Sequence, residues 1–187
     1  MRDSAARPWT IVAEPAGSPV ARELLREYYT DVADRYYLLH EGRRSTPQEI
    51  DEGVAGYPLG DLAPPRGELL VARRDGAPAG CAGVRLLDAG TAELKQVFVR
   101  PGSRGRGAAG ALMRAVEATA ARLGAERIRL DTRLDLTEAV ALYRRHGYAE
   151  IAPYHFDDPY AEVYFEKRLT ATAAGEPPNG TAPQPTW

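Results

Sequence analysis

The chain has 187 residues, a length that suits one domain with its own hydrophobic core. Its formal net charge at pH 7 is −2, and its 24 basic and 26 acidic residues are spread along the sequence rather than gathered in blocks. This balance argues against a nucleic-acid-binding or membrane-surface protein, because such proteins show a basic face or stripe.

The two ends of the chain carry no periodic apolar pattern. Residues 1–8 lack the apolar core of a secretory signal, and no segment approaches the roughly 20 apolar residues needed to cross a bilayer. The single cysteine, Cys81, lies among small residues and is expected to pack as a small apolar side chain rather than to act as a nucleophile. We expect a cytoplasmic protein with one domain over residues 1–169 and a disordered tail over residues 170–187.

The first third of the sequence predicts a strand and two helices. Trp9–Ala13 alternates weakly and is read as a short strand, and apolar residues then recur at helical spacing over Pro19–His40. Thr46-Pro47-Gln48-Glu49 has the form of a capping box with proline at the first helical position. A second, short helix is therefore expected to begin there and to end by Gly53 or Gly56, followed by a proline-rich loop.

The middle of the sequence predicts three strands. Glu68–Arg73 and Ala79–Leu87 flank the hairpin signal Asp75-Gly76, and Thr91–Val99 follows after a short turn. Strands in this order form an antiparallel meander.

The second half of the sequence alternates helices with strands. Helices are expected over Gly107–Leu123 and Leu136–His146, and strands over Arg127–Asp131, Tyr148–Ala152 and Glu162–Leu169. This order implies a crossover unit joined to the meander. The predicted fold class is α/β in the α+β sense, with a mixed sheet.

The most informative segment runs from the strand Val97-Phe98-Val99 through the glycine-rich turn Arg104–Ala109 into a helix. Glycines let several backbone N–H groups approach one point, where the helix N-terminus adds a partial positive charge, so the turn suits a phosphate. Its spacing matches neither the dinucleotide fingerprint nor the Walker loop. Taken alone, these residues also fit an ordinary strand-to-helix turn.

Two motifs together are more specific than either one. Arg104-x-x-Gly107-x-Ala109, after the Val-Phe-Val strand, resembles motif A of the GNAT superfamily of N-acetyltransferases, and residues 141–148 resemble its motif B. The resemblance covers about Glu68–Leu169. It implies the GNAT fold: a mixed, mostly antiparallel sheet of six to seven strands, flanked by about four helices, with acetyl-CoA held where the fourth and fifth strands splay apart.

The resemblance also assigns residues to acetyl-CoA, the implied co-substrate. The pantetheine arm would pair with the backbone of Val97, Phe98 and Val99, and the pyrophosphate would lie on Arg104, Gly105, Arg106, Gly107, Ala108 and Ala109. Many members carry Asn seven residues before the motif B tyrosine, where this chain has Leu136. Its neighbour Thr137 is the candidate for that contact.

Acetyl transfer to an amine needs an oxyanion donor, a base and an acid. The resemblance suggests the backbone N–H of Val99 or a neighbour for the oxyanion, and Tyr143, which would also border the cofactor, as acid for the coenzyme A sulfur. Glu93 is the candidate base, and an ideal strand would place it on the face of Val97 and Val99. The alternatives are a core role for Tyr143, an exposed charge at Glu93 and a bound water as base.

The acceptor is expected between the first two helices and the loop between the last two strands. The candidate acceptor-binding residues are Tyr36, His40, Glu41, Glu93 and Tyr154, because rings and carboxylates suit a cationic amine. No metal site is expected, since the histidines lack ligand spacing.

These assignments predict direct acetylation of a primary amine of a small molecule, such as an amino acid derivative, a polyamine or an aminoglycoside-like compound. Three alternatives stay open: acetylation of a protein lysine or N-terminus, an acyl-CoA sensor without activity, and a structural domain without a ligand. The resemblance also allows a homodimer.

Overall fold

The computed structural model describes residues 8–56 and 59–169. Its strands form one sheet and are β1 (Thr10–Ala13), β2 (Gly67–Arg74), β3 (Ala77–Leu86), β4 (Thr91–Val99), β5 (Arg127–Thr132), β6 (Ala149–Ile151) and β7 (Val163–Arg168). Their order in this 7-stranded sheet is β1-β2-β3-β4-β5-β7-β6. The predicted strands are confirmed to within about two residues at each end.

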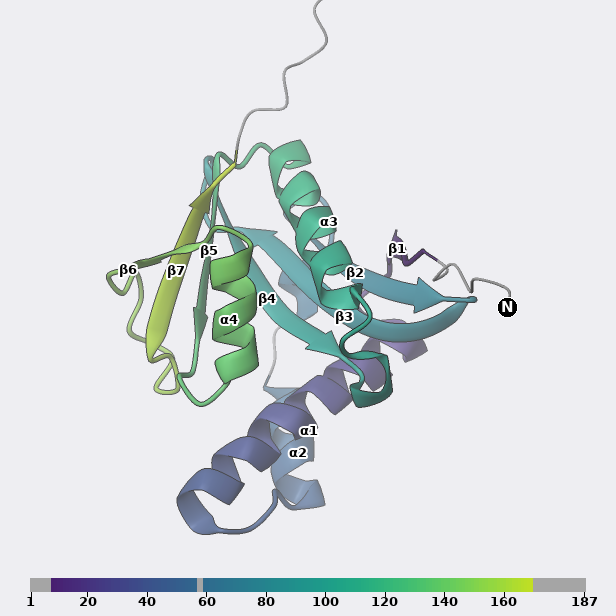
Figure 1. The fold of residues 1–187 in the computed structure, drawn as a ribbon, viewed down its shortest axis with the longest axis vertical. Helices are drawn as coiled ribbons and strands as arrows, with labels where there is room; N and C mark the ends of the chain where they lie inside the picture. Colours follow the sequence, from purple (N-terminus) through teal and green to yellow (C-terminus); the bar gives the residue numbers. More distant parts are fainter. Residues whose placement is uncertain (1–7, 57–58, 170–187) are drawn as a thin grey trace, which may run out of the picture.

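Within the described residues, four α-helices flank the sheet: α1 (Pro19–Glu41), α2 (Pro47–Ala55), α3 (Ala108–Arg122) and α4 (Thr137–Arg145). In Figure 1, α3 and α4 lie against one face of the sheet, and α1 and α2 lie behind it and extend beyond its lower edge. A short 3-10 helix, η1 (Leu59–Leu62), interrupts the stretch expected to be a loop, and another, η2 (Pro101–Ser103), follows β4. The predicted fold class is confirmed, and the predicted tail over residues 170–187 lies outside the described residues.

Local sequence signals explain where the first two helices begin. At α1, the Ser18 hydroxyl accepts a hydrogen bond from the backbone N–H of Ala21, and Gly42, with a φ of 68°, ends the helix. At α2, the Thr46 hydroxyl accepts from the backbone N–H of Glu49 while the Glu49 carboxylate accepts from that of Thr46. The predicted capping box is thus confirmed.

Apolar side chains are buried on both faces of the sheet. Leu112, Val116 and Ile128 belong to the larger cluster, between the sheet and α3 and α4. A second cluster, between the sheet and α1, contains Leu24 and Cys81. Burial raises the pKa of the Cys81 thiol to about 12, so the thiol stays neutral and packs as a small apolar group, as expected.

The parallel pairing of β4 with β5 is short. It covers only Thr91–Glu93 and Arg127–Arg129 among the described residues. Beyond Glu93 the two strands separate, which confirms the splayed strand pair implied by the resemblance.

A β-bulge interrupts β4 at Gln96, which has a φ of 56°. Leu94, before the bulge, packs in the cluster under α3, and so do Val97 and Val99 after it. The extra residue therefore reverses the alternation of side chains between the two faces. Glu93, next to Leu94, lies on the opposite face from Val97 and Val99, and the prediction that it shares their face is wrong.

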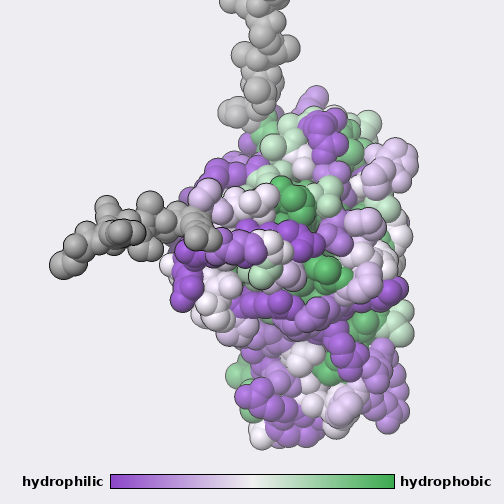
Figure 2. Space-filling model, turned by 90° about the vertical axis from the view of Figure 1, so that its right-hand side faces the viewer, coloured by the Kyte–Doolittle hydropathy of each residue, from purple (hydrophilic) through white to green (hydrophobic). Residues whose placement is uncertain are grey.

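The face of the molecule seen in Figure 2 is mostly hydrophilic, with hydrophobic residues in small separate patches. Among the helices of the described segments, none is long and apolar enough to span a membrane.

Candidate active site

A cleft of about 1070 Å³ opens where β4 and β5 separate. Residues of α1 and α2 form one wall, and the start of α3 together with one side of α4 along its length forms the other. The second half of β4, Leu94–Val99, is the floor, and residues 157–160 of the β6–β7 loop border one end. A volume near the upper limit of ordinary ligand pockets leaves room for a cofactor arm together with an acceptor.

The glycine-rich turn forms the other end of the cleft. Gly105 and Gly107 have left-handed φ values of 72° and 86°, and Gly107 is the N-cap of α3. The Trp9 indole N–H donates to the carbonyl oxygen of Arg106 at 2.6 Å, and Nε of Arg104 donates to the last carbonyl oxygen of β4 at 2.8 Å. These two hydrogen bonds fix the turn, so that the start of α3 faces the cleft. The N–H groups and partial positive charge of this helix start favour the binding of an anionic group there.

Most of the predicted cofactor residues line this cleft, namely Val97, Phe98, Val99, Arg104, Gly105, Gly107, Ala108, Ala109 and Tyr143. Arg106 and Thr137 are not among the lining residues of the described chain, although Leu136, beside Thr137, is. Arg145 and His146, at the end of α4, also line the cleft. Neither was predicted to do so.

Tyr143 lies both in the core and at the cleft, the two positions considered for it from the sequence. Its ring packs in the core, with centroids 6.1 Å from Tyr148 and 6.0 Å from Phe165, and it also lines the cleft. Burial raises the pKa of the Tyr143 phenol above its usual value. The hydroxyl therefore stays protonated across the physiological range, as a proton donor must.

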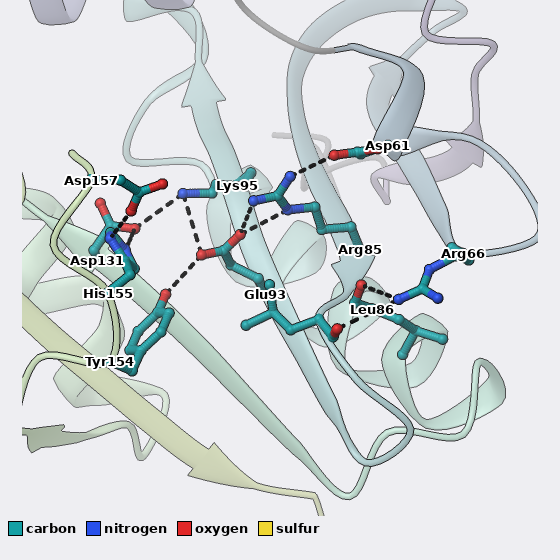
Figure 3. Close-up of polar contacts among 11 residues, drawn as sticks. Asp61, Arg66, Arg85, Leu86, Glu93, Lys95, Asp131, Tyr154, His155 and Asp157 are labelled. Carbon is teal, nitrogen blue, oxygen red and sulfur yellow. Dashed lines mark hydrogen bonds and ion pairs between the residues drawn. The ribbon is translucent and has the colours of Figure 1, made fainter.

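Glu93 lies beneath the cleft rather than in it, which corrects the expectation of a carboxylate in line with the groove. Its side chain is 2% exposed and is not among the described lining residues. Figure 3 shows its contacts: Arg85 Nε lies 2.8 Å from Oε2, while the Tyr154 hydroxyl donates to Oε1 at 2.9 Å and Lys95 Nζ lies 3.4 Å from it. Arg85 and Lys95 line the cleft and cover this carboxylate.

A second polar group lies beside Glu93, at the end of β5. Asp131 Oδ1 is 3.1 Å from Lys95 Nζ and 3.3 Å from His155 Nε2, and His155 Nδ1 is 2.9 Å from the exposed Asp157 (Figure 3). Oxygen and nitrogen atoms of Glu93, Asp131 and His155 lie within 4.8 Å of one another, a grouping that suits a metal ion. The Lys95 ammonium contacts both carboxylates and supplies the positive charge there.

Only some of the predicted acceptor-binding residues line the cleft. Tyr36 lines the cleft, where its ring meets Tyr160 edge to face with centroids 5.1 Å apart. The ring of His40 lies tilted against that of Tyr36, with centroids 4.4 Å apart, and Glu41 pairs with Arg43 at the end of α1. His40, Glu41 and Tyr154 are not among the lining residues of the described chain.

The sequence and the fold match known proteins. The sequence model of the acetyltransferase (GNAT) family matches residues 20–148, which is more than half of the chain. The chain belongs to the acetyltransferase (GNAT) family. As a GNAT protein it is an acyltransferase of the N-acetyltransferase type, and the alternative of a structural domain without a ligand is wrong.

Curated GNAT relatives cover most of the folded chain. An uncharacterized N-acetyltransferase of Schizosaccharomyces pombe is 32% identical over 136 residues, which span 72% of this chain and 83% of that protein. An IAA acetyltransferase of Azospirillum brasilense is 33% identical over 114 residues, which span 59% of this chain and 74% of that protein.

Solved structures show the same fold. A putative acyl-CoA N-acyltransferase from Klebsiella pneumoniae superposes with a TM-score of 0.64 at 24% identity, over 87% of this chain and 98% of that one. A putative acetyltransferase from Salmonella typhimurium, solved with its cofactor acetyl-CoA, gives a TM-score of 0.58 at 18% identity, over 91% of this chain and 99% of that one.

Proposed function

We propose that this GNAT protein transfers the acetyl group of acetyl-CoA directly to a primary amine of a small molecule. The observation that carries the proposal is one continuous cleft, which runs from the glycine-rich turn along the floor of β4 to a tyrosine-lined end between α1 and the β6–β7 loop. Related folds have been solved with acetyl-CoA bound, in proteins from Salmonella typhimurium and Elizabethkingia anophelis.

The turn and the unpaired part of β4 support acetyl-CoA binding at one end of the cleft. The pyrophosphate would lie on the turn Arg104–Ala109, and the pantetheine arm would run along Val97–Val99, where β4 has no partner in β5. Arg145 offers further positive charge for a phosphate, and His146, whose pKa is lowered by burial, offers a neutral ring N–H. Contacts of Arg106 and Thr137 with acetyl-CoA stay predictions, and both residues are neighbours in sequence of residues that line the cleft.

The reaction forms one C–N bond and breaks one C–S bond. The amine nitrogen attacks the thioester carbonyl, and the backbone N–H of Val99 or a neighbour stabilises the oxyanion. Tyr143 gives its phenol proton to the departing thiolate. Because Glu93 is covered by Arg85 and Lys95, we favour a water molecule as the first proton acceptor, with Asp131 beside it on the wall of the cleft.

The shape of the acceptor end favours a small molecule over a protein segment. Tyr36 of α1 and Tyr160 of the β6–β7 loop touch across the cleft, so two separate elements enclose the acceptor. A lysine of a folded protein, or an N-terminal segment, would need a shallow, open groove there.

A thiol-release assay with acetyl-CoA and a panel of primary amines tests the proposal. We expect amine-dependent release by the wild type and a loss of about a hundredfold in kcat for Tyr143→Phe. Tyr148→Phe is the matched control, because Tyr148 is also a buried ring of this cluster but is not among the described lining residues. Equal rates for wild type and Tyr143→Phe would remove Tyr143 from the reaction. Thermal stabilisation by acetyl-CoA without release for any amine would favour the sensor.

A further inference from the structure

A second hollow, of about 530 Å³, adjoins the acceptor end of the cleft. It lies among the end of α1, the loop between β5 and α4, and the β6–β7 loop. Tyr36, Arg133, Pro159 and Tyr160 line both the hollow and the cleft, so the two spaces share a wall. We call this hollow the distal chamber.

The shared wall is aromatic and is fixed by an arginine. The rings of Tyr36 and Tyr160 meet edge to face, and the Arg133 guanidinium lies 5.5 Å from the centroid of Tyr36. Three hydrogen bonds hold this guanidinium: Nη1 donates to the carbonyl oxygen of Val32 at 3.0 Å, and Nε and Nη2 each donate to an oxygen of Asp135 at 2.8 Å. The charges of Arg133 and Asp135 are therefore satisfied within the protein.

Apolar side chains are unusually exposed around the distal chamber. Leu39 is 63% exposed, Leu134 is 56% exposed and Tyr160 is 53% exposed, and they come from three separate segments. Isolated exposed apolar residues are common, but several that converge on one concave site mark a place where a ligand or a partner binds. Their rim is continuous with the acceptor end of the cleft, which identifies the ligand as the acceptor.

We propose that the distal chamber holds the far end of the acceptor and that this end is an aromatic ring. A ring would pack between Leu39 and Leu134 and make edge or face contacts with Tyr36 and Tyr160, while the amine stays in the cleft near Asp131. The acceptor class is thus a primary amine joined to an aromatic ring by a short linker. This inference rests on the proposed function.

Matched acceptors and variants test the inference. The probes are ethylamine and 2-phenylethylamine, which share the amine and differ by the ring. Leu134→Asp places a charge in the distal chamber at an exposed position, and Leu38→Asp is its control, because Leu38 is an exposed leucine of α1 that does not line the distal chamber.

We expect the wild type to favour 2-phenylethylamine over ethylamine by about tenfold or more in kcat/KM. Leu134→Asp should abolish this preference while turnover of ethylamine and the KM for acetyl-CoA stay unchanged, and Leu38→Asp should keep it. Equal use of the two amines by the wild type, or an equal loss for both in Leu134→Asp, overturns the inference but leaves the proposed function standing.

Two further measurements separate the remaining outcomes. If neither amine releases thiol, the proposed function fails for these acceptors, and binding of 2-phenylethylamine followed by thermal shift decides the inference: stabilisation lost in Leu134→Asp supports it, and no stabilisation overturns it.

Sedimentation velocity tests whether a second copy of the chain occupies the distal chamber instead. A change of oligomeric state in Leu134→Asp but not in Leu38→Asp would assign the exposed leucines to an interface and overturn the inference.

Discussion

Arg85 and Glu93 face each other across β3 and β4, and two nitrogens of the guanidinium lie 2.8 Å from the same carboxylate oxygen. Glu93 is buried, whereas Arg85 and Lys95 above it border the cleft. This arrangement makes Glu93 the buried counter-ion that orients two cations at the floor of the acceptor end.

Replacing this counter-ion should reduce stability. Glu93→Gln leaves Arg85 and Lys95 without its charge, and we expect the free energy of unfolding to fall by about 2 kcal/mol, less than for a fully buried pair because both cations are partly exposed. Urea denaturation measures the effect. Glu150→Gln is the control, since the pair of Glu150 with Arg144 is exposed and should change stability by less than about 0.5 kcal/mol. Unchanged stability with a large loss of kcat would instead make Glu93 the base.

The glycine-rich turn should be sensitive at Gly107. A β-carbon there would lie 4.0 Å from Nε1 of Trp9, an ordinary contact, but the φ of 86° costs an L-residue about 1–2 kcal/mol. We expect Gly107→Ala to lower the affinity for acetyl-CoA by roughly tenfold in calorimetry, because the N–H groups at the start of α3 move. Gly102→Ala, whose β-carbon would meet open space at a position without a left-handed φ, should bind like the wild type. If the two variants bind alike, the shape of the turn does not determine affinity.

Local patterns predicted the elements of this fold because their causes are local. The capping box at Thr46 and Glu49 needs only four residues, and the strand Thr91–Val99 has the predicted bounds. The motif B tyrosine, Tyr143, and the glycine-rich turn were assigned to the cofactor through the resemblance to the two GNAT motifs, and both line the cleft.

Local patterns could not predict on which face of the sheet the Glu93 side chain lies. Gln96 takes a left-handed φ without being glycine, and the sequence from Leu94 to Val97 carries no sign of the bulge. The meeting of Lys95, Asp131 and His155 depends on two strands and a loop that are far apart in sequence.

The packing of α2 on α1 should respond to Gly53. A β-carbon at Gly53 would lie 1.9 Å from the ring of Tyr29, so Gly53→Ala must displace that ring or shift α2. Because both helices border the cleft, we expect the KM for the acceptor to rise several-fold while affinity for acetyl-CoA stays the same. Steady-state kinetics with each substrate varied shows this. Gly56→Ala, whose β-carbon would have ordinary contacts at 3.6 Å, is the control, and an equal effect of both variants would contradict the prediction.

Acid should weaken the start of α2. The Arg43 guanidinium, together with the backbone N–H of Thr46, lowers the pKa of Glu49 from 4.5 to about 2. The unfolded chain binds the proton more readily, so the stability due to this carboxylate is present above about pH 4.5 and is lost as the pH falls toward about 2. We expect the urea midpoint to decline less between about pH 5 and about pH 3 in Glu49→Gln than in the wild type. Glu52→Gln, on the same helix, should decline like the wild type, and identical curves for all three would refute this role of Glu49.

The buried residues of α1, Ala21, Leu24 and Leu25, all lie in its first two turns, whereas Tyr36 and the acceptor wall belong to its last turns. Under the proposed function, folding and acetyl-CoA binding thus depend on one part of the molecule, and choice of acceptor on another. Mutations can accumulate along the outer turns of α1 without unfolding the protein or silencing its chemistry. In evolution or in laboratory selection, new acceptors should therefore be acquired first through changes in this helix.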